Sequence, residues 1–288
     1  MTPDSVKHHG LIHAQYSEHA GAPFYRHVMG GGSPVIHYGI YDSPSTSMQE
    51  ATEEATHRLL TLAIRTLGSS SLHNIIDLGA GPGGSAHLLA RETGAVVTCV
   101  DLCPHHNQEN ETIAEKLGLH KKILTHTGSF EALPDHWTGR FNLAWSQEAI
   151  CHACDKLTAF REARRVLQND GAWVFSDIFL ADTASPEQSE VFSDINAVAR
   201  LSTLDQHMER LVKAGFGEIT FHDWTPFLNE NFRRMLHQIK THRTSLLEQG
   251  VPAELLTRFT ESLNQRLAWS PGSVLRWGAF TCKPTNIN

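Results

Sequence analysis

Residues 74–84 read Asn-Ile-Ile-Asp-Leu-Gly-Ala-Gly-Pro-Gly-Gly, a short apolar run that leads into a glycine-rich loop. The apolar run has the length and composition of a buried strand, and residues 86–90 continue with the apolar spacing of a helix. A nucleotide cofactor binds at such a strand–loop–helix junction in an α/β sheet, because glycine lets the backbone approach the ligand closely. This stretch therefore predicts a cofactor-binding α/β fold.

Strands and helices continue to alternate along the chain from this stretch. Further strands are expected at 95–100, 122–125, 141–145 and 171–176, with helices at 108–117 and 157–167. After residue 180 the pattern predicts a helix at 203–214, a strand at 217–224, helices at 229–249 and 253–268, and a strand at 274–282. This alternation is typical of a parallel sheet built from right-handed βαβ units. We therefore predict an α/β, Rossmann-like, seven-stranded sheet with helical insertions.

The remaining segments are expected to cover that sheet within a single domain, 1–288. Residues 1–70 are expected to form an N-terminal helical cap, and 227–272 a helical lid insertion. The core would then comprise 71–226 and 273–283. Because the cap and the lid lie outside the core pattern, we expect them to close over the bound ligands.

Composition and charge exclude several classes of function. The chain has 40% hydrophobic and 19% charged residues, a balance typical of a soluble globular enzyme. Its net charge of −7 disfavours binding to nucleic acid. No apolar run has the length of a membrane span, and the first residues carry no apolar leader segment. Five thinly spread cysteines favour a reduced, cytoplasmic protein.

The glycine loop alone fits two kinds of cofactor. Gly79, Gly81 and Gly84 satisfy the dinucleotide pattern, and Asp101 ends the next strand, where an acid binds ribose hydroxyls. Asp77 distinguishes the two cofactors, since a carboxylate so close to the loop would repel a pyrophosphate and attract the ammonium of a methionine moiety. The pattern therefore favours S-adenosylmethionine (SAM) over NAD.

Asp-x-Gly-x-Gly-x-Gly followed by an acid on the next strand resembles the SAM fingerprint of class I, Rossmann-like methyltransferases. Other segments resemble the sarcosine/dimethylglycine N-methyltransferases more narrowly, and the similarity runs from about residue 20 to 283. The segments that carry this narrower resemblance are Phe24-Tyr25 through Tyr41, Asp77 through Ala86, Trp145-Ser-Gln-Glu-Ala-Ile-Cys-His152, Gly215 through Phe221 and Leu275-Arg-Trp-Gly-Ala-Phe280.

The resemblance implies that SAM is bound on the carboxyl side of strands one to three and leaves as S-adenosylhomocysteine. The residues implied are Tyr25, His37, Asp77, Gly79, Ala80, Gly81, Asp101, Leu102, Asn107, Gly128, Ser129, Phe130, Ser146 and Gln147. Of these, Tyr25 and His37 would close over the cofactor from the N-terminal cap, with a structural role as the equal alternative for each. One departure is Ser129, which replaces the acid usual at that place and can hydrogen-bond only as a neutral group.

Catalytic candidates follow the fourth and fifth strands. His152 is expected to face the methyl group, either as a general base or as a contact to the acceptor, with a structural role as the alternative. Asp177 would either orient a histidine or cap the following turn. The acceptor itself is expected to contact Trp145, Gln147, His152, Trp224 and Arg276, although Trp145 fits the core equally well and Arg276 could pair with an acid.

Cys151-His152-Ala153-Cys154 has the spacing of half a zinc site. A structural zinc site needs four ligands, and no second pair lies at a suitable distance in the sequence. We therefore predict no bound metal.

These observations leave three hypotheses about function. The first is a SAM-dependent N-methyltransferase of a small amine or amino acid. The second keeps the fold and methylates an oxygen or carbon of a specialised metabolite, such as a natural product or a prenyl-type acceptor. The third is a non-catalytic cofactor-binding protein, which the intact glycine loop disfavours. A homo-oligomer is compatible with each of them.

Overall fold

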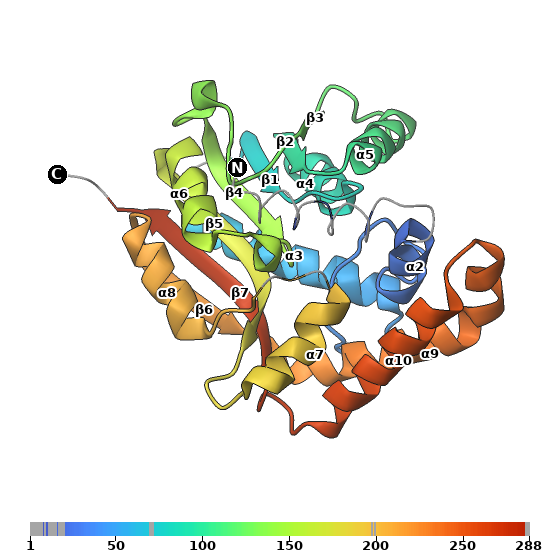
Figure 1. Ribbon diagram of the computed structural model, residues 1–288. Coiled ribbons are helices and arrows are strands. Elements are labelled where there is room, and N and C mark those ends of the chain that lie inside the picture. The colour runs from blue at the N-terminus through green and yellow to red at the C-terminus, as the bar shows by residue number, and fades with distance from the viewer. Residues whose placement is uncertain are drawn as a thin grey trace. The chain divides into compact units, whose positions relative to one another are not determined.

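The computed structural model builds one seven-stranded sheet in the order β3-β2-β1-β4-β5-β7-β6 (Figure 1). It describes residues 21–68, 72–196, 198 and 200–285, together with His8, Gly10 and Tyr16. The strands are β1 (Asn74–Leu78), β2 (Val96–Asp101), β3 (Ile123–Thr127), β4 (Phe141–Gln147), β5 (Leu167–Leu180), β6 (Phe216–Asp223) and β7 (Leu275–Pro284). The predicted α/β class is confirmed, with each of these strands near its expected place.

The strands from β1 to β5 run parallel, and β1 lies between β2 and β4. Asp77 is in register with Cys99 on β2 and with Trp145 on β4. After β1 the chain adds β2 and then β3 on one side of β1. It then crosses over and adds β4 and β5 on the other side of β1. Ligands of open α/β sheets bind at such a reversal, outside the carboxyl ends of the strands. The order of strands therefore places the glycine loop at the expected binding edge.

The last two strands run antiparallel to each other. The Thr285 amide donates to the Gly215 carbonyl over 2.9 Å, and the Trp224 amide donates to the Trp277 carbonyl over 2.9 Å. The start of β6 therefore lies beside the end of β7, and the end of β6 lies beside the start of β7. The sheet is consequently mixed, with β7 between β5 and β6.

Helices connect the strands and form most of the remaining structure. They are α2 (Gly21–Val28), α3 (Met48–Leu67), α4 (Gly84–Thr93), α5 (Pro104–Lys116), α6 (Lys156–Val166), α7 (Pro186–Asn196), α8 (Leu204–Lys213), α9 (Leu228–Glu248) and α10 (Ala253–Ala268). Short 3₁₀ turns are η1 (Asp135–Trp137), η2 (Ile150–His152) and η3 (Thr225–Phe227). Within the described residues, none of the helices combines the length and apolar character needed to cross a bilayer.

The chain divides into two compact units. The core unit comprises Thr56–Asp177, Leu204–His222 and the residues from Gly278 onward, and it contains most of the sheet. The helical unit comprises the residues up to Ala55, Ile178–Thr203 and Asp223–Trp277. The division of a single domain into a 1–70 cap, a core and a 227–272 lid stays a prediction.

Within the helical unit, Asn231 joins α9 to the segment before α3. Its side-chain oxygen accepts from the Gly39 amide over 2.7 Å, and its side-chain nitrogen donates to the Gly39 carbonyl over 2.8 Å. A side chain at Gly39 would lie only 2.6 Å from the Ala51 Cβ, so the backbone here approaches α3 closely. Phe24 of α2 packs on Phe259 of α10, with ring centroids 4.5 Å apart. These contacts bring distant parts of the sequence into one packed unit.

Candidate functional site

The glycine loop between β1 and α4 has a backbone that only glycine adopts easily. Gly79 and Gly81 have φ angles of +84° and +53°. A Cβ added at Gly79 would lie 2.3 Å from the Ala149 Cβ, whereas one at Gly81 would meet nothing within 4 Å. The amides of Gly79 and Ala80 both donate to the Val100 carbonyl, over 2.9 and 3.1 Å. The loop is thus held against β2, and its Gly81 side is open.

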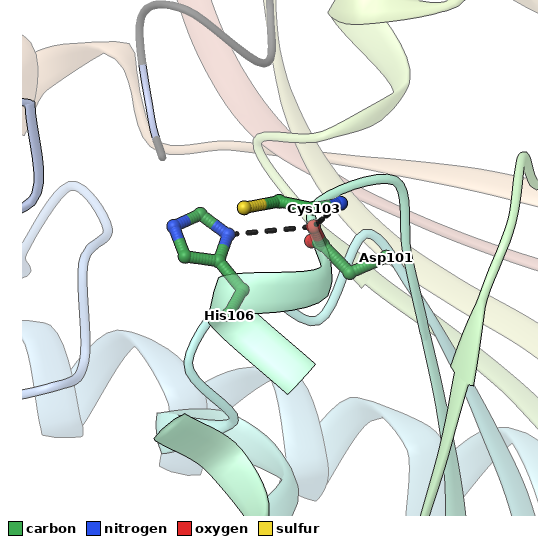
Figure 2. A group of neighbouring side chains, drawn as sticks. All are labelled: Asp101, Cys103 and His106. Carbon is green, nitrogen blue, oxygen red and sulfur yellow. Dashed lines mark hydrogen bonds and ion pairs between the residues drawn. The ribbon is translucent and has the colours of Figure 1, made fainter. Parts of the chain in front are cut away.

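Asp101, at the end of β2, contacts both the glycine loop and the residues at the start of α5, and Figure 2 shows its contacts to Cys103 and His106. One carboxylate oxygen accepts from the Gly81 amide over 2.8 Å. The other accepts from the Cys103 amide over 2.8 Å and lies 3.3 Å from His106 Nδ1. A carboxylate has about four lone-pair positions, so these contacts leave capacity for one further donor. Because the side chain is 14% exposed, a ligand hydroxyl could reach it.

Three potential metal ligands lie close together here, namely Asp101, Cys103 and His106 (Figure 2). Among the described residues they form a group whose ligand atoms all lie within 4.8 Å of one another. The carboxylate of this group already accepts backbone amides, which makes it part of the loop structure. The sequence pattern had instead drawn attention to Cys151 and Cys154, of which the first is buried and the second exposed. That no metal binds stays a prediction.

Asp77 lies almost completely buried, at 3% exposure, directly before the loop. Burial raises the pKa of Asp77 to about 8, and the negative charge of Asp101 acts in the same direction. No donor among the described side chains forms a hydrogen bond to this carboxyl group. A buried acid in this condition favours a cationic ligand, because a positive charge would offset the cost of ionising it.

The segment after β3 lies beside the glycine loop and the end of β2. The Gly128 amide donates to the Asp101 backbone carbonyl over 3.0 Å. A Cβ at Gly79 would lie 3.7 Å from the Phe130 ring, which places that ring beside the loop. Ser129 Oγ accepts from the Glu131 amide over 3.1 Å and so shapes the turn.

Leu102 and Asn107 follow Asp101 in the chain. Leu102 is half-buried directly after Asp101. Asn107 donates from Nδ2 to Thr127 Oγ1 over 2.8 Å, and its buried Oδ1 has no hydrogen-bond donor within the part of the chain that the structure describes. Asn107 therefore has an acceptor atom to offer at this edge.

The residues at the exit of β4 differ in what they can offer a ligand. Ser146 is fully buried and donates to the Leu78 carbonyl over 2.8 Å, a contact that ties β4 to β1. Trp145 is 0% exposed, which fits the core alternative. Gln147 accepts from Ser85 Oγ over 2.7 Å and from Thr56 Oγ1 over 3.2 Å, which fixes its amide. Its Nε2 is buried and meets no acceptor among the described residues, so Gln147 retains a donor.

The two catalytic candidates lie in different surroundings. His152 is half-buried in η2, where its amide donates to the Ala149 carbonyl over 3.0 Å. Asp177 is completely buried on β5, with one carboxylate oxygen 3.8 Å from Nε2 of the equally buried His207. Burial and then the negative charge of Asp177 raise the pKa of Cys151 well above its ordinary value. Asp177 thus belongs to a buried polar cluster with His207 and Cys151, and His207 on α8 carries no sequence signal for this role.

Four other predicted residues lie in the helical unit. Tyr25 is 2% exposed and packs edge-on against Phe24, with centroids 5.2 Å apart. His37 is half-buried in the segment before α3. Trp224 is buried and packs against Trp277, with ring centroids 5.1 Å apart.

Arg276, the fourth of these residues, pairs with Asp223 over 3.0 Å. This pair is the alternative role that the sequence allowed for an arginine at this place. A buried arginine of the same unit, Arg266, was missed by the sequence analysis.

The fold, the glycine loop and the acid at the end of β2 together define a Rossmann-like methyltransferase. The chain belongs to the methyltransferase domain family, whose profile matches residues 69–238. The expectations of an enzyme that transfers methyl groups and of SAM as its cofactor are thereby confirmed.

Among the curated relatives of this chain are N-methyltransferases of small amino acids. The chain is 29% identical over 265 residues to a sarcosine/dimethylglycine N-methyltransferase of Halorhodospira halochloris, a match that covers 92% of each chain. It is 30% identical over 263 residues to a glycine/sarcosine/dimethylglycine N-methyltransferase of Actinopolyspora halophila. That match covers 91% of this chain but only 45% of the longer relative. The predicted resemblance to this group is confirmed.

A solved structure shows the same fold. A Galdieria sulphuraria protein, assigned as a sarcosine dimethylglycine methyltransferase, superposes with a TM-score of 0.84 at 23% identity. The superposition covers 95% of this chain and 100% of the other. At this identity the likeness establishes the fold, including the mixed seven-stranded sheet.

Replacing Asp101 with alanine is expected to weaken SAM binding at least tenfold. A charged hydrogen bond to a ribose hydroxyl contributes about 1.5–3 kcal/mol, and the Gly81 amide would also lose its acceptor. Titration calorimetry with S-adenosylhomocysteine measures the change, and Asp170→Ala, an exposed acid in the same unit, is the matched control. Unchanged affinity of the Asp101→Ala variant would remove this residue from the site.

Proposed function

We propose that the protein transfers the methyl group of SAM to the nitrogen of a small amine, most specifically an amino acid. The observation that carries this proposal is the 29% identity to a sarcosine/dimethylglycine N-methyltransferase over 92% of both chains. Similarity over nearly the full length includes the segments outside the cofactor loop, where an acceptor would be selected. The products are an N-methylated amine and S-adenosylhomocysteine.

The main task of the enzyme in this reaction is to align the acceptor nitrogen with the methyl group of SAM. The nitrogen lone pair attacks the methyl carbon of the sulfonium, the carbon–sulfur bond breaks, and its electron pair stays on sulfur. The donor is already activated, so rate enhancement comes from holding the two partners in line and away from water. An alkylamine with a pKa near 10 must first lose its proton, which costs about 4 kcal/mol at pH 7. A nearby base or a pocket that disfavours the ammonium recovers part of this cost.

We propose the following roles for the described residues. The open backbone at Gly81 and the remaining acceptor capacity of Asp101 support binding of the ribose, and buried Asp77 suits the ammonium of the methionine moiety. Phe130, beside the loop, suits the adenine. His152 and the unused Nε2 donor of Gln147 are the candidates to contact the acceptor at the end of β4.

The setting of the reaction is also part of the proposal. We propose a cytoplasmic enzyme that works on a free small molecule and not on nucleic acid, alone or as a homo-oligomer. Support comes from the net charge of −7 and from the absence of disulfides among Cys99, Cys103, Cys151, Cys154 and Cys282.

The decisive experiment is methyl transfer from radiolabelled SAM across a panel of acceptors. The panel contains glycine, sarcosine and dimethylglycine beside phenol, alcohol and prenyl diphosphate acceptors. Label in an N-methylated amino acid, with equal release of S-adenosylhomocysteine, is the expected result. Label found only on oxygen or carbon would replace the proposal with the second hypothesis. No transfer despite tight S-adenosylhomocysteine binding would favour a non-catalytic protein.

A further inference from the structure

The turn η2, which carries His152, is anchored by Lys156, the first residue of α6. Lys156 is buried, with 7% of its surface exposed. Its Nζ donates to the Cys151 carbonyl over 3.1 Å and to the Ala153 carbonyl over 3.3 Å. These carbonyls belong to the residues immediately before and after His152. One buried amino group therefore holds the backbone on both sides of this candidate catalytic residue.

The N-terminal cap of α6 fixes the position of Lys156. The Asp155 side chain accepts hydrogen bonds from the amides of Leu157 and Thr158, over 3.0 and 3.2 Å. A carboxylate at this place satisfies amides that the first turn of a helix leaves without partners. The Asp155 amide in turn donates to a carboxylate oxygen of Glu131. Lys156 thus reaches η2 from a helix end that is itself held in place.

The segment that enters η2 is also constrained. Glu148, directly after β4, has a φ angle of +46°, which is unfavourable for a residue other than glycine. A residue keeps such a conformation only where its surroundings hold it there. The Glu148 amide donates to the Ser176 carbonyl over 2.9 Å, and Ser176 Oγ donates to Glu148 Oε1 over 2.7 Å. The segment around η2 is therefore held by β5 at its start and by α6 at its end.

Burying the amino group of Lys156 costs free energy. Burial lowers the pKa of Lys156, while the negative charges of Cys151 and Asp177 act in the opposite direction. Lysine is almost never fully buried unless its charge is paired or hydrogen-bonded. Arg161 of the same helix is exposed, the ordinary location of a basic side chain. Lys156 departs from that pattern at the point where α6 meets η2.

We propose that Lys156 is a positioning residue, which holds η2 so that His152 keeps the place from which it contacts the methyl acceptor. The inference rests on the proposed function, in which His152 accepts a proton or contacts the acceptor. Methyl transfer depends on alignment, and a displacement of about 1 Å can cost roughly a hundredfold in rate. Because Lys156 binds the carbonyls on both sides of His152, loss of its amino group frees the backbone there to shift. In this proposal Lys156 acts only through His152.

A double-mutant cycle tests that connection. Lys156→Met, His152→Ala and the double variant are assayed at saturating SAM, with an acceptor that wild type methylates. We expect Lys156→Met to lower kcat/KM for the acceptor roughly 10–100-fold, with S-adenosylhomocysteine affinity within about twofold of wild type. The loss should appear in the same parameter, kcat or acceptor KM, as in His152→Ala. In the His152→Ala background the substitution should change kcat/KM by less than about twofold, because the two residues act as a unit.

Arg161→Met, a change of an exposed basic residue in the same helix, is the matched control and should keep wild-type kinetics. A merely structural role for Lys156 predicts a lower melting temperature, with either wild-type kinetics or an equal loss in both backgrounds. Each of these results would overturn the proposal.

Lys156→Gln is measured in parallel, in case Lys156→Met does not fold. Its shorter side chain keeps a polar end but cannot reach both carbonyls as lysine does. Its loss in kcat/KM should be smaller and should likewise disappear in the His152→Ala background. Wild-type kinetics of this variant would count against a positioning role.

Failure of this inference can be told apart from failure of the proposed function. If His152→Ala has wild-type kinetics while wild type methylates an amine, the function stands and the role of Lys156 is overturned. If wild type methylates only oxygen or carbon, the proposed function fails and the same cycle applies with that acceptor.

A measurement without turnover covers the case in which wild type methylates no acceptor. The NMR signal of the His152 ring is assigned by its loss in His152→Ala. It should shift in Lys156→Met and stay at the wild-type position in Arg161→Met. An unchanged signal in Lys156→Met would overturn the inference.

Discussion

Asp77→Asn is expected to weaken SAM binding by about 100-fold or more and to stabilise the protein in the absence of cofactor. Removing one partner of a buried, hydrogen-bonded charge pair costs about 2–5 kcal/mol, and the proposed partner here is the ammonium of the methionine moiety. Asparagine has nearly the same shape, so the loss reports the charge and not the packing. Titration calorimetry at pH 7.5 measures the change in affinity.

The pKa of Asp77 gives this prediction a signature in pH. Burial raises that pKa from 3.8 to about 8, so the carboxyl group of the free protein is largely protonated at pH 7. Binding a cation requires the ionised form, and affinity should therefore increase as pH rises from 6 toward 8, by at most about tenfold per pH unit. The Asp77→Asn variant cannot ionise at this position and should lose that slope.

Stability should change in the opposite direction. Because the folded pKa lies above the unfolded one, the folded state binds more protons between about pH 4 and pH 8. The free energy of unfolding of the unliganded wild type should therefore fall as pH rises through this window. The Asp77→Asn variant escapes this loss, so its advantage in denaturant unfolding should grow from pH 5 to pH 8.

Asp135→Asn, an exposed acid of the same unit, controls for a general effect of removing one charge. If the Asp77→Asn variant binds SAM as tightly as wild type, with the same dependence on pH, Asp77 does not meet the ammonium.

His152→Ala is expected to lower kcat by roughly 10²–10⁴ if His152 accepts a proton from the amine. The residue is half-buried in η2, directly after β4. It lies in the core unit, as the glycine loop does. Since the loop is held by Val100 and Asp101, we expect S-adenosylhomocysteine affinity to remain within about twofold of wild type. Steady-state kinetics at saturating SAM, with the acceptor concentration varied, measure both parameters.

The same data separate the two proposed roles. If His152 only positions the acceptor, the loss appears mainly in the acceptor KM. The exposed His120→Ala serves as the control for removing a histidine from this unit. Wild-type kcat and KM in the His152→Ala variant would leave a structural role for this residue.

Much of the fold could be predicted because its signals are local. The apolar run before Asp77, the glycines after it and the acid ending β2 lie within one βαβ unit, so nearest neighbours in sequence are also neighbours in space. The strand order then placed their carboxyl ends at one edge. The start of β5 differed from the predicted one: the strand begins at Leu167 and not at Gly171. Its pairing with β4 is irregular between Phe141 and Leu143.

The side chains of β4 mark where local pattern stops being informative. A strand buried on both faces reads as a continuous apolar run, so its sequence does not reveal which residues face a ligand. Trp145 and Ser146 are completely buried in the structure, whereas the amide of Gln147 retains a donor that no described residue accepts. Sequence reasoning treated Ser146 and Gln147 as ligand contacts and left Trp145 open between a ligand contact and the core.

The sequence by itself determined the class of fold and favoured SAM as the cofactor, since these depend on glycines and acids at fixed spacing, and its resemblance to a known family indicated the kind of reaction. Only the tertiary structure decided the partners of buried polar groups. His207 meets Asp177 from a separate helix, and Arg266 meets the rings of Phe192 and Phe232 from two further helices. In a helical sequence these polar residues resemble solvent-facing positions. Burial alone makes their charges costly, and burial is a property of packing between distant segments.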